Sequence, residues 1–112
     1  MSREIRMLFE EVARRGHDAR LAGLRGRYRF DVEGVGSWLV TVNDGALTVE
    51  ETRGEAECII SGDAVDALRI ARGEQNLLTA FLQGRVDVDG DLTLAQRWRG
   101  LLPSADAGVA GG

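Results

Sequence analysis

Apolar residues near the start of the chain recur with the spacing of a helix. Between residues 2 and 16 they lie three or four positions apart, at Ile5, Leu8, Phe9 and Val12. This spacing predicts a helix with one apolar stripe. Gly16 is suited to end that helix, because glycine adopts the left-handed conformation of a helix C-terminus. The next segment, 17–26, fits either a short helix or a loop, and its pattern leaves both open.

From Arg27 the period changes to two, which is the period of a strand with one buried face. Three successive runs alternate in this way, at 27–33, 38–43 and 46–51. Asp44-Gly45 lies between the last two and predicts a hairpin, because Asp-Gly readily takes the positive φ angles of a primed turn. In the middle run Trp38, Val40 and Val42 alternate with Leu39, Thr41 and Asn43. We take Trp38 and Val40 to face the helices, while the opposite orientation stays open.

The second half of the chain alternates between strand and helix patterns. An apolar run at 58–60 predicts a fourth strand, and Asp63 is suited to cap a helix that ends at Gly73. The stripe of that helix comprises Val65, Leu68, Ile70 and Ala71. A further helical piece begins near residues 74–76 and ends at Gly84, and it is predicted to bury Leu77, Leu78, Phe81 and Leu82.

A fifth strand and a last helix complete the predicted elements. Val86 and Val88 alternate with charged residues, which predicts the strand. Asp91 is suited to cap the helix, which is expected to continue to Pro103. Its apolar residues keep helical spacing: Leu94, Ala95, Trp98, Leu101 and Leu102. The 112-residue length fits one core, so we expect one domain at 1–103 and a disordered Gly/Ala-rich tail at 104–112.

The charge pattern argues against nucleic acid as a partner. All basic residues are arginines, they are interleaved with acidic residues, and the net charge is −4. One local group, Arg20, Arg25, Arg27 and Arg29, is either the solvated face of a strand or a basic strip that meets an anionic lipid surface. No apolar run reaches the ~20 residues that span a bilayer, so membrane contact is expected to be at most peripheral. A single cysteine and no leader pattern favour the cytoplasm.

No catalytic or metal-binding constellation is visible in the sequence. Cys58 lies in an apolar run and the only histidine, His17, lies in a different element, so a thiol–imidazole pair is not indicated. Asp87, Asp89 and Asp91 alternate along a strand and its turn, but they lack the other ligands of a calcium loop. We therefore expect neither an enzyme nor a cofactor.

The stretch Ala-Phe-Leu-Gln-Gly-Arg-Val-Asp-Val-Asp-Gly-Asp at 80–91 resembles the signature of the sterol carrier protein family. Residues 26–45 are similar to the opening hairpins of that family, and 57–73 to its next strand and helix. The resemblance extends over about 9–102. It implies a five-stranded, mainly antiparallel α+β fold with helices on one face and an apolar tunnel between the layers. Such a tunnel takes sterols, fatty acids, fatty acyl-CoA or other lipids.

Two features differ from many members of the family. The chain has no lysines, which often frame the tunnel mouth in eukaryotic members, and it ends in Gly-Gly where peroxisomal members carry Ser-Lys-Leu. By resemblance, large apolar side chains of the helices and of the helix-facing sheet are expected to line the tunnel. They are Phe30, Trp38, Val40, Leu68, Leu77, Leu78, Phe81, Leu82, Leu94, Trp98 and Leu102.

The predicted function is carriage of a fatty acid, fatty acyl-CoA, sterol-like or quinone-like lipid, without catalysis. The alternative is a protein-interaction or accessory module that presents a lipid-like substrate to a partner enzyme, for instance in quinone biosynthesis. An exposed apolar patch beside the last helix would favour this alternative.

Overall fold

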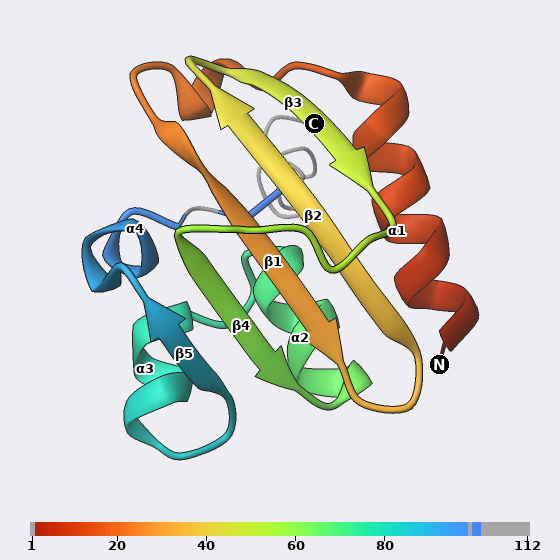
Figure 1. Ribbon diagram of the computed structural model, residues 1–112, viewed down its shortest axis with the longest axis vertical. Helices are drawn as coiled ribbons and strands as arrows, with labels where there is room; N and C mark the ends of the chain where they lie inside the picture. The colour runs from red at the N-terminus through yellow and green to blue at the C-terminus, as the bar shows by residue number, and fades with distance from the viewer. Residues whose placement is uncertain (1, 99, 102–112) are drawn as a thin grey trace, which may run out of the picture.

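A five-stranded sheet forms one layer of the protein, in the spatial order β3-β2-β1-β4-β5 (Figure 1). The computed structural model describes residues 2–98 and 100–101. The strands are β1 (Arg25–Val32), β2 (Gly36–Asn43), β3 (Ala46–Glu50), β4 (Cys58–Gly62) and β5 (Asp87–Gly90). β1 is parallel to β4 and the other neighbouring pairs are antiparallel. The mainly antiparallel α+β fold expected from the sequence is therefore confirmed.

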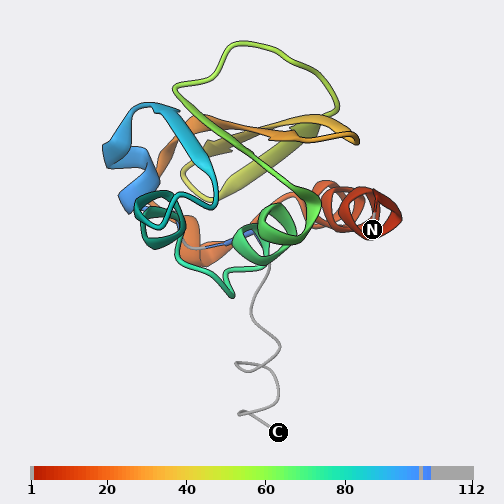
Figure 2. The ribbon, with the colours of Figure 1, turned by 90° about the horizontal axis from the view of Figure 1, so that it is seen from below.

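Helices cover one face of this sheet. They are α1 (Ser2–Arg15), the 3₁₀ helix η1 (Ala19–Leu21), α2 (Ala64–Ala71), α3 (Leu77–Leu82) and α4 (Leu92–Gln96). Figure 2 shows α1, α2 and α3 on the same side of the sheet, while the connection from β3 to β4 passes over the opposite face. The short α4 lies beside β4 and β5. The core fills the layer between the sheet and the helices.

Side-chain caps fix the starts of the short helices. Asp63 Oδ1 accepts a hydrogen bond from Asp66 N at 2.8 Å, which begins α2. Asp91 Oδ1 accepts from Thr93 N at 2.8 Å, which begins α4. Both caps were expected from the sequence. For α3 the cap is Asn76, which decides a start that the pattern had left open.

The β2–β3 hairpin has the predicted two-residue turn. Asn43 pairs with Ala46, and between them Asp44 and Gly45 have φ angles of 51° and 93°. Both angles lie in the left-handed region that a primed turn requires. The backbone twist of a primed turn matches the twist of the two strands that it connects.

Strand register decides which residues of β2 face the helices. Trp38 pairs with Phe30 of β1, and its ring stacks on Phe9 of α1. The choice of Trp38 and Val40 as the helix-facing set is therefore confirmed. Leu39 points to the other face, where a Cβ added at Gly54 would lie 3.2 Å from the leucine Cδ2. The β3–β4 connection thus buries Leu39 on the side of the sheet away from the helices.

Two residues expected to be buried are exposed instead. Val65 of α2 is 47% exposed and Leu82 of α3 is 75% exposed. The buried stripe of α2 consists of Ala67, Leu68, Ile70 and Ala71. Because side chains advance by about 100° per residue, Val65 points away from this stripe. The same geometry turns Leu82 outward once Leu77 and Ala80 face the core.

The last helix is shorter than predicted. α4 ends at Gln96, whereas the sequence pattern predicted a helix that continues to Pro103. Beyond Gln96 the chain forms hydrogen bonds with the end of α2. Trp98 Nε1 donates a hydrogen bond to the Ile70 carbonyl at 2.8 Å, and Leu101 N donates to the Ala71 carbonyl at 2.7 Å. The second bond pairs the Leu101 backbone N–H, which a continued helix would have paired within itself, and the first pairs a buried indole N–H.

Some expectations concern residues outside the described part of the chain. Leu102 and the tail at 104–112 belong to this group, so the proposed domain boundary stays a prediction. Within the described residues, no helix combines the length and the apolar character needed to cross a bilayer.

Two glycines, Gly84 after α3 and Gly90 at the end of β5, allow a test of backbone packing. Both have positive φ, 76° at Gly84 and 101° at Gly90. A Cβ at Gly84 would have no neighbour within 4 Å, whereas one at Gly90 would lie 2.1 Å from the Glu57 carbonyl oxygen. Gly84→Ala should cost on the order of 1–2 kcal/mol from its φ angle alone. Gly90→Ala should cost at least about 2 kcal/mol more, because it also separates β5 from β4.

Urea denaturation of the two variants and the parent chain measures this difference in the free energy of unfolding. Equal losses for both variants would show that Gly90 is required only for its φ angle and not for its contact with β4.

Candidate apolar ligand-binding site

Five aromatic rings cross the layer between the sheet and the helices. Phe9 stacks on Trp38 at 5.0 Å between centroids and lies 5.5 Å from Phe30. Trp98 lies 5.3 Å from Phe30 and 4.8 Å from Tyr28. All five side chains are buried. We call this set the aromatic row; it extends from α1 and β2 at one end to the segment after α4 at the other.

The polar tips of the aromatic row are satisfied by backbone carbonyls. Tyr28 Oη donates to the Leu94 carbonyl at 2.8 Å, and Trp98 Nε1 donates to the Ile70 carbonyl. Burial raises the pKa of the Tyr28 hydroxyl, so this group stays protonated and remains a donor. A buried Tyr or Trp without such a partner would destabilise the fold, so these two bonds fix where the rings lie.

Most of the side chains predicted to line a tunnel lie in this core. Buried members are Phe30, Trp38, Val40, Leu68, Leu77, Leu94 and Trp98, and half-buried ones are Leu78 and Phe81. Phe81 packs against the core from α3. Leu82 faces solvent, and Leu102 lies outside the described residues. The structure thus brings most of the predicted residues together, while their contact with a ligand stays a prediction.

Phe9 and Tyr28 belong to the aromatic row but were missing from the predicted lining. Both had a signal in the sequence, since Phe9 lies on the apolar stripe of the first helix and Tyr28 on the buried face of the first strand. Sequence reasoning placed the site toward the last helices because the family resemblance is strongest there. The ring of Phe9 shows that the end of the layer beneath α1 is apolar too, while Tyr28 adds to the end at Trp98.

The described residues do not show the tunnel that was expected between the layers. Four depressions stand out on the described surface, and none is lined by a ring of the aromatic row. One of about 310 Å³ lies along α1 between Glu4 and Arg14, with Arg72 at its side. The structure therefore does not show an open tunnel, although it shows the two apolar walls between which one would form.

The arginines that the sequence grouped together each have a polar partner. The pairs are Arg20 with Asp18, Arg25 with Asn43, Arg27 with Glu57 and Arg29 with Asp31. The guanidinium of Arg29 also donates to the carbonyls of Arg53 and Gly54. Because each of these arginines has a polar partner within the protein, the solvated face of a strand is favoured over a basic strip that meets an anionic lipid surface.

Cys58 is a core residue. Its side chain is 0% exposed, and burial raises the pKa of the thiol to about 11, with a further rise from the charge of Asp91. A thiol of this kind is protonated at neutral pH and is therefore a poor nucleophile. His17 is exposed and bridges to Ala46 at the start of β3. In the described part of the chain, no three or more His, Cys, Asp or Glu side chains gather to hold a metal ion.

Solved structures of several proteins share this fold. Residues covering 84% of the chain match 92% of sterol carrier protein 2 like 2 from Aedes aegypti, with 18% identity and a TM-score of 0.60. A protein described as UbiJ-SCP2, a ubiquinone synthesis protein, matches over 85% of both chains with 25% identity and a TM-score of 0.58. Identities below 25% show the fold alone.

A larger enzyme contains a similar domain. The sec-alkylsulfatase Pisa1 from Pseudomonas sp. matches 87% of the chain with 22% identity and a TM-score of 0.64. The chain spans only 16% of that enzyme. No curated protein matches the chain in sequence.

A family model provides the remaining evidence. The model of the SCP-2 sterol transfer family matches residues 8–103, which include the sheet, the aromatic row and the second half of α1. The match extends over far more than half of the 112 residues. The chain therefore belongs to the SCP-2 sterol transfer family.

Proposed function

We propose that this protein binds one hydrophobic ligand between its sheet and its helices and carries it without catalysing a reaction. The ligand would be a fatty acid, a fatty acyl-CoA, or a sterol-like or quinone-like lipid. The observation that supports this proposal is the aromatic row, which offers a continuous apolar surface between the two layers of a sterol transfer fold. A chain-like ligand would lie along this surface.

Apolar contact alone gives enough free energy for such a function. Burial of a methylene group contributes ~0.8 kcal/mol, so about fifteen methylenes contribute about 12 kcal/mol. Association costs ~4–15 kcal/mol in lost freedom of motion. Useful affinity thus requires most of a long alkyl chain to be buried, and the core needs no catalytic or charged group to achieve it.

Because the rings of the aromatic row pack against one another, a ligand that lies along them would displace part of the protein. The sheet is a poor candidate, since β1 is hydrogen-bonded to a strand on each side. On the helix side, the wall near Trp98 consists of α3 and α4, helices of six and five residues, and of the segment after α4. Helices this short have little stability of their own and open more easily than the sheet. We therefore place ligand entry at the wall that holds Trp98.

Fluorescence of single-tryptophan variants tests this route. Trp38→Phe leaves only Trp98, and Trp98→Phe leaves only Trp38. On titration with palmitate, the emission of Trp38→Phe should move to longer wavelength, because the displaced Trp98 indole meets water. The emission of Trp98→Phe should stay constant, because Trp38 is held between Phe9 and the guanidinium of Arg6, which lies 5.5 Å from its ring.

Circular dichroism of both variants checks that they fold. A shift confined to Trp98→Phe would place the entry route at the Trp38 end, and would contradict displacement of Trp98.

Phe81 gives a second test, with Val65 as its control. Phe81→Asp places a carboxylate against the apolar core, whereas Val65→Asp places the same charge on an exposed helix position. A buried unpaired charge costs several kcal/mol, so Phe81→Asp should abolish retention of a lipid. Val65→Asp should retain it as the parent chain does.

Native mass spectrometry followed by organic extraction measures this retention. A folded Phe81→Asp variant that keeps a stoichiometric lipid would remove Phe81 from the site.

One observation favours a second function, that of an accessory module. Leu82 of α3 is 75% exposed and Leu92 of α4 is 45% exposed, and the two helices are in contact. Exposed apolar side chains near the last helix suit a contact with a partner enzyme that acts on a lipid-like substrate. A bare mass for the parent chain, together with no binding of added palmitate, would favour this function over carriage.

A further inference from the structure

One edge of the sheet is open, whereas the chain itself covers the other. At the β3 edge, Leu47 N donates to the Gly16 carbonyl at 2.9 Å, His17 bridges to Ala46, and α1 packs alongside. At the opposite edge, β5 pairs with β4 alone among the described strands. Figure 1 shows β5 at the margin of the sheet, on the side away from α1. The unpaired backbone groups of such an edge can pair with an added strand.

The hydrogen-bond pattern identifies which backbone groups of β5 point outward. Asp91 N donates to the Glu57 carbonyl at 2.7 Å, and in an antiparallel pair such bonds recur at every second residue. The odd-numbered residues of β5 therefore direct their N–H and C=O groups toward β4. Val88 and Gly90 direct theirs outward, and in the described part of the chain no hydrogen bond reaches these groups. We call the outward N–H and C=O groups of Val88 and Gly90 the β5 edge.

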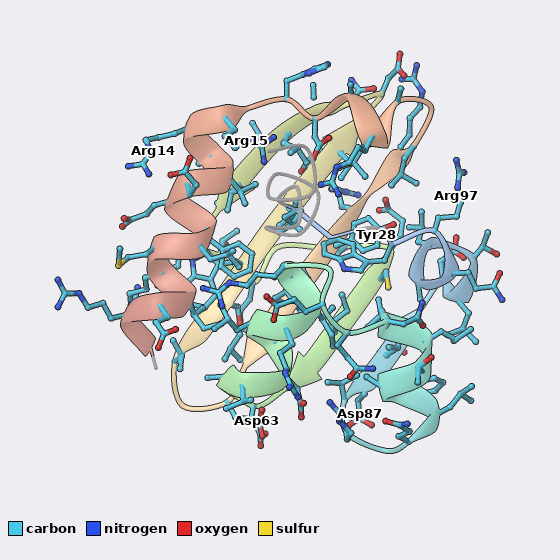
Figure 3. All side chains as sticks on the ribbon, turned by 180° about the vertical axis from the view of Figure 1, so that it is seen from behind. Arg14, Arg15, Tyr28, Asp63, Asp87 and Arg97 are labelled. Carbon is cyan, nitrogen blue, oxygen red and sulfur yellow. The ribbon has the colours of Figure 1, made fainter. Side chains whose placement is uncertain are left out.

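Acidic side chains line one face of the β5 edge. Asp87 and Asp89 lie on the face away from the helices, because Val88 between them packs against the core. Both are exposed, and neither forms an ion pair with a described residue. Arg85 of the preceding loop is engaged with Asp66 at 3.2 Å. Figure 3 shows Asp87 at the rim of the molecule, beside the loop that leads into β5. This face therefore carries negative charge that no described residue pairs.

Apolar side chains lie on the helix side of the same edge. Val88 is half-buried there, and the exposed Leu92 begins α4 just after β5. The exposed Leu82 belongs to α3, which both ribbon views place next to β5 (Figures 1 and 2). Side chains of an added strand would alternate between the two faces. They would thus meet carboxylates on one face and apolar surface on the other.

The charge pattern selects against a second copy of this chain as the added strand. Antiparallel pairing of two β5 edges centred on Val88 would place Asp87 opposite Asp89 of the other copy. Pairing centred on Asp89 would place that residue opposite itself. Like charges directly opposite one another destabilise a strand pair. The segment 102–112 does not match the edge either, since its sequence contains no basic residue. The complement of this edge is therefore a segment of another protein.

We propose that the β5 edge binds an extended segment of a partner protein in which basic and apolar residues alternate. Its backbone would exchange hydrogen bonds with the edge and add a strand to the sheet. Its basic side chains would lie on the face of Asp87 and Asp89, and its apolar ones on the side of α3 and α4. This inference goes beyond lipid carriage, because it requires no bound lipid, and it specifies the kind of partner suited to the accessory role.

The probe is the peptide Lys-Val-Lys-Val-Lys-Val-Lys, blocked at both ends. Its control, Lys-Lys-Val-Val-Val-Lys-Lys, has the same composition and charge without the alternation. Hydrogen exchange of the backbone amides, followed by NMR, reports where a peptide pairs. At saturation, the alternating peptide should slow exchange of the Val88 and Gly90 amides about tenfold or more, because an added strand would bond them. The control peptide should leave both rates unchanged.

Two pairs of variants separate the backbone contribution from the charge. Val88→Pro removes the outward N–H and no hydrogen bond to β4, whereas Val88→Ala keeps that N–H and also shortens the side chain. Val88→Pro should abolish binding of the alternating peptide, and Val88→Ala should weaken it by no more than about twofold. Asp89→Asn should weaken binding about threefold. Glu10→Gln, which removes the same charge from an exposed position of α1, should leave it unchanged.

Unchanged exchange at Val88 and Gly90, equal protection by both peptides, or binding retained in Val88→Pro would overturn the proposal. The same loss in Glu10→Gln as in Asp89→Asn would also overturn it, since attraction would then come from net charge alone. Circular dichroism checks the fold of Val88→Pro, and if that variant does not fold, the exchange rates and the charge variants decide. A dimer in sedimentation that Val88→Pro dissociates would assign the edge to a second copy instead. None of these results bears on lipid carriage.

Discussion

The indole of Trp98 joins the two layers of the protein, and much of the structure depends on where it lies. Its ring packs against Tyr28 and Phe30 of the sheet, and its Nε1 donates to the Ile70 carbonyl at the end of α2. This one side chain ties the last described segment to α2 and packs against the sheet at one end of the aromatic row. Under the proposed entry route, the side chain that holds this wall in place is also the one that a ligand would displace.

The free energy needed to release Trp98 sets a lower limit on ligand size. Loss of the indole hydrogen bond costs on the order of 1 kcal/mol, and exposure of the ring costs about 1.5–3 kcal/mol. At ~0.8 kcal/mol per methylene, about three to five methylenes only replace what Trp98 contributed. Short apolar molecules therefore gain nothing by entering, whereas long chains do. Close packing of Trp98 against Tyr28 and Phe30 would thus suit a carrier that selects for chain length.

Local sequence signals predicted most of the fold. Alternation placed the strands, Asp63 and Asp91 marked helix starts, and the Asp44-Gly45 turn fixed the hairpin. Each of these signals acts between residues close in sequence, so a single chain displays it. The early end of α4 did not follow from sequence, because helical spacing continues through Leu101 while the hydrogen bonds that end the helix come from α2.

The site was harder to predict than the fold for the same reason. The sequence identified large apolar residues, but burial alone does not distinguish core from ligand contact. Leu82 shows this limit, since its turn of helix is apolar on several sides and only packing decides which side faces out.

The exposed leucines of α3 and α4 join the proposed roles of carrier and accessory module. Leu82 and Leu92 lie on the two short helices beside the wall that holds Trp98. A partner enzyme that contacts these side chains would therefore stand next to the proposed route of ligand entry. Carriage and presentation would use one bound geometry, and they would differ only in whether a second protein contacts these leucines.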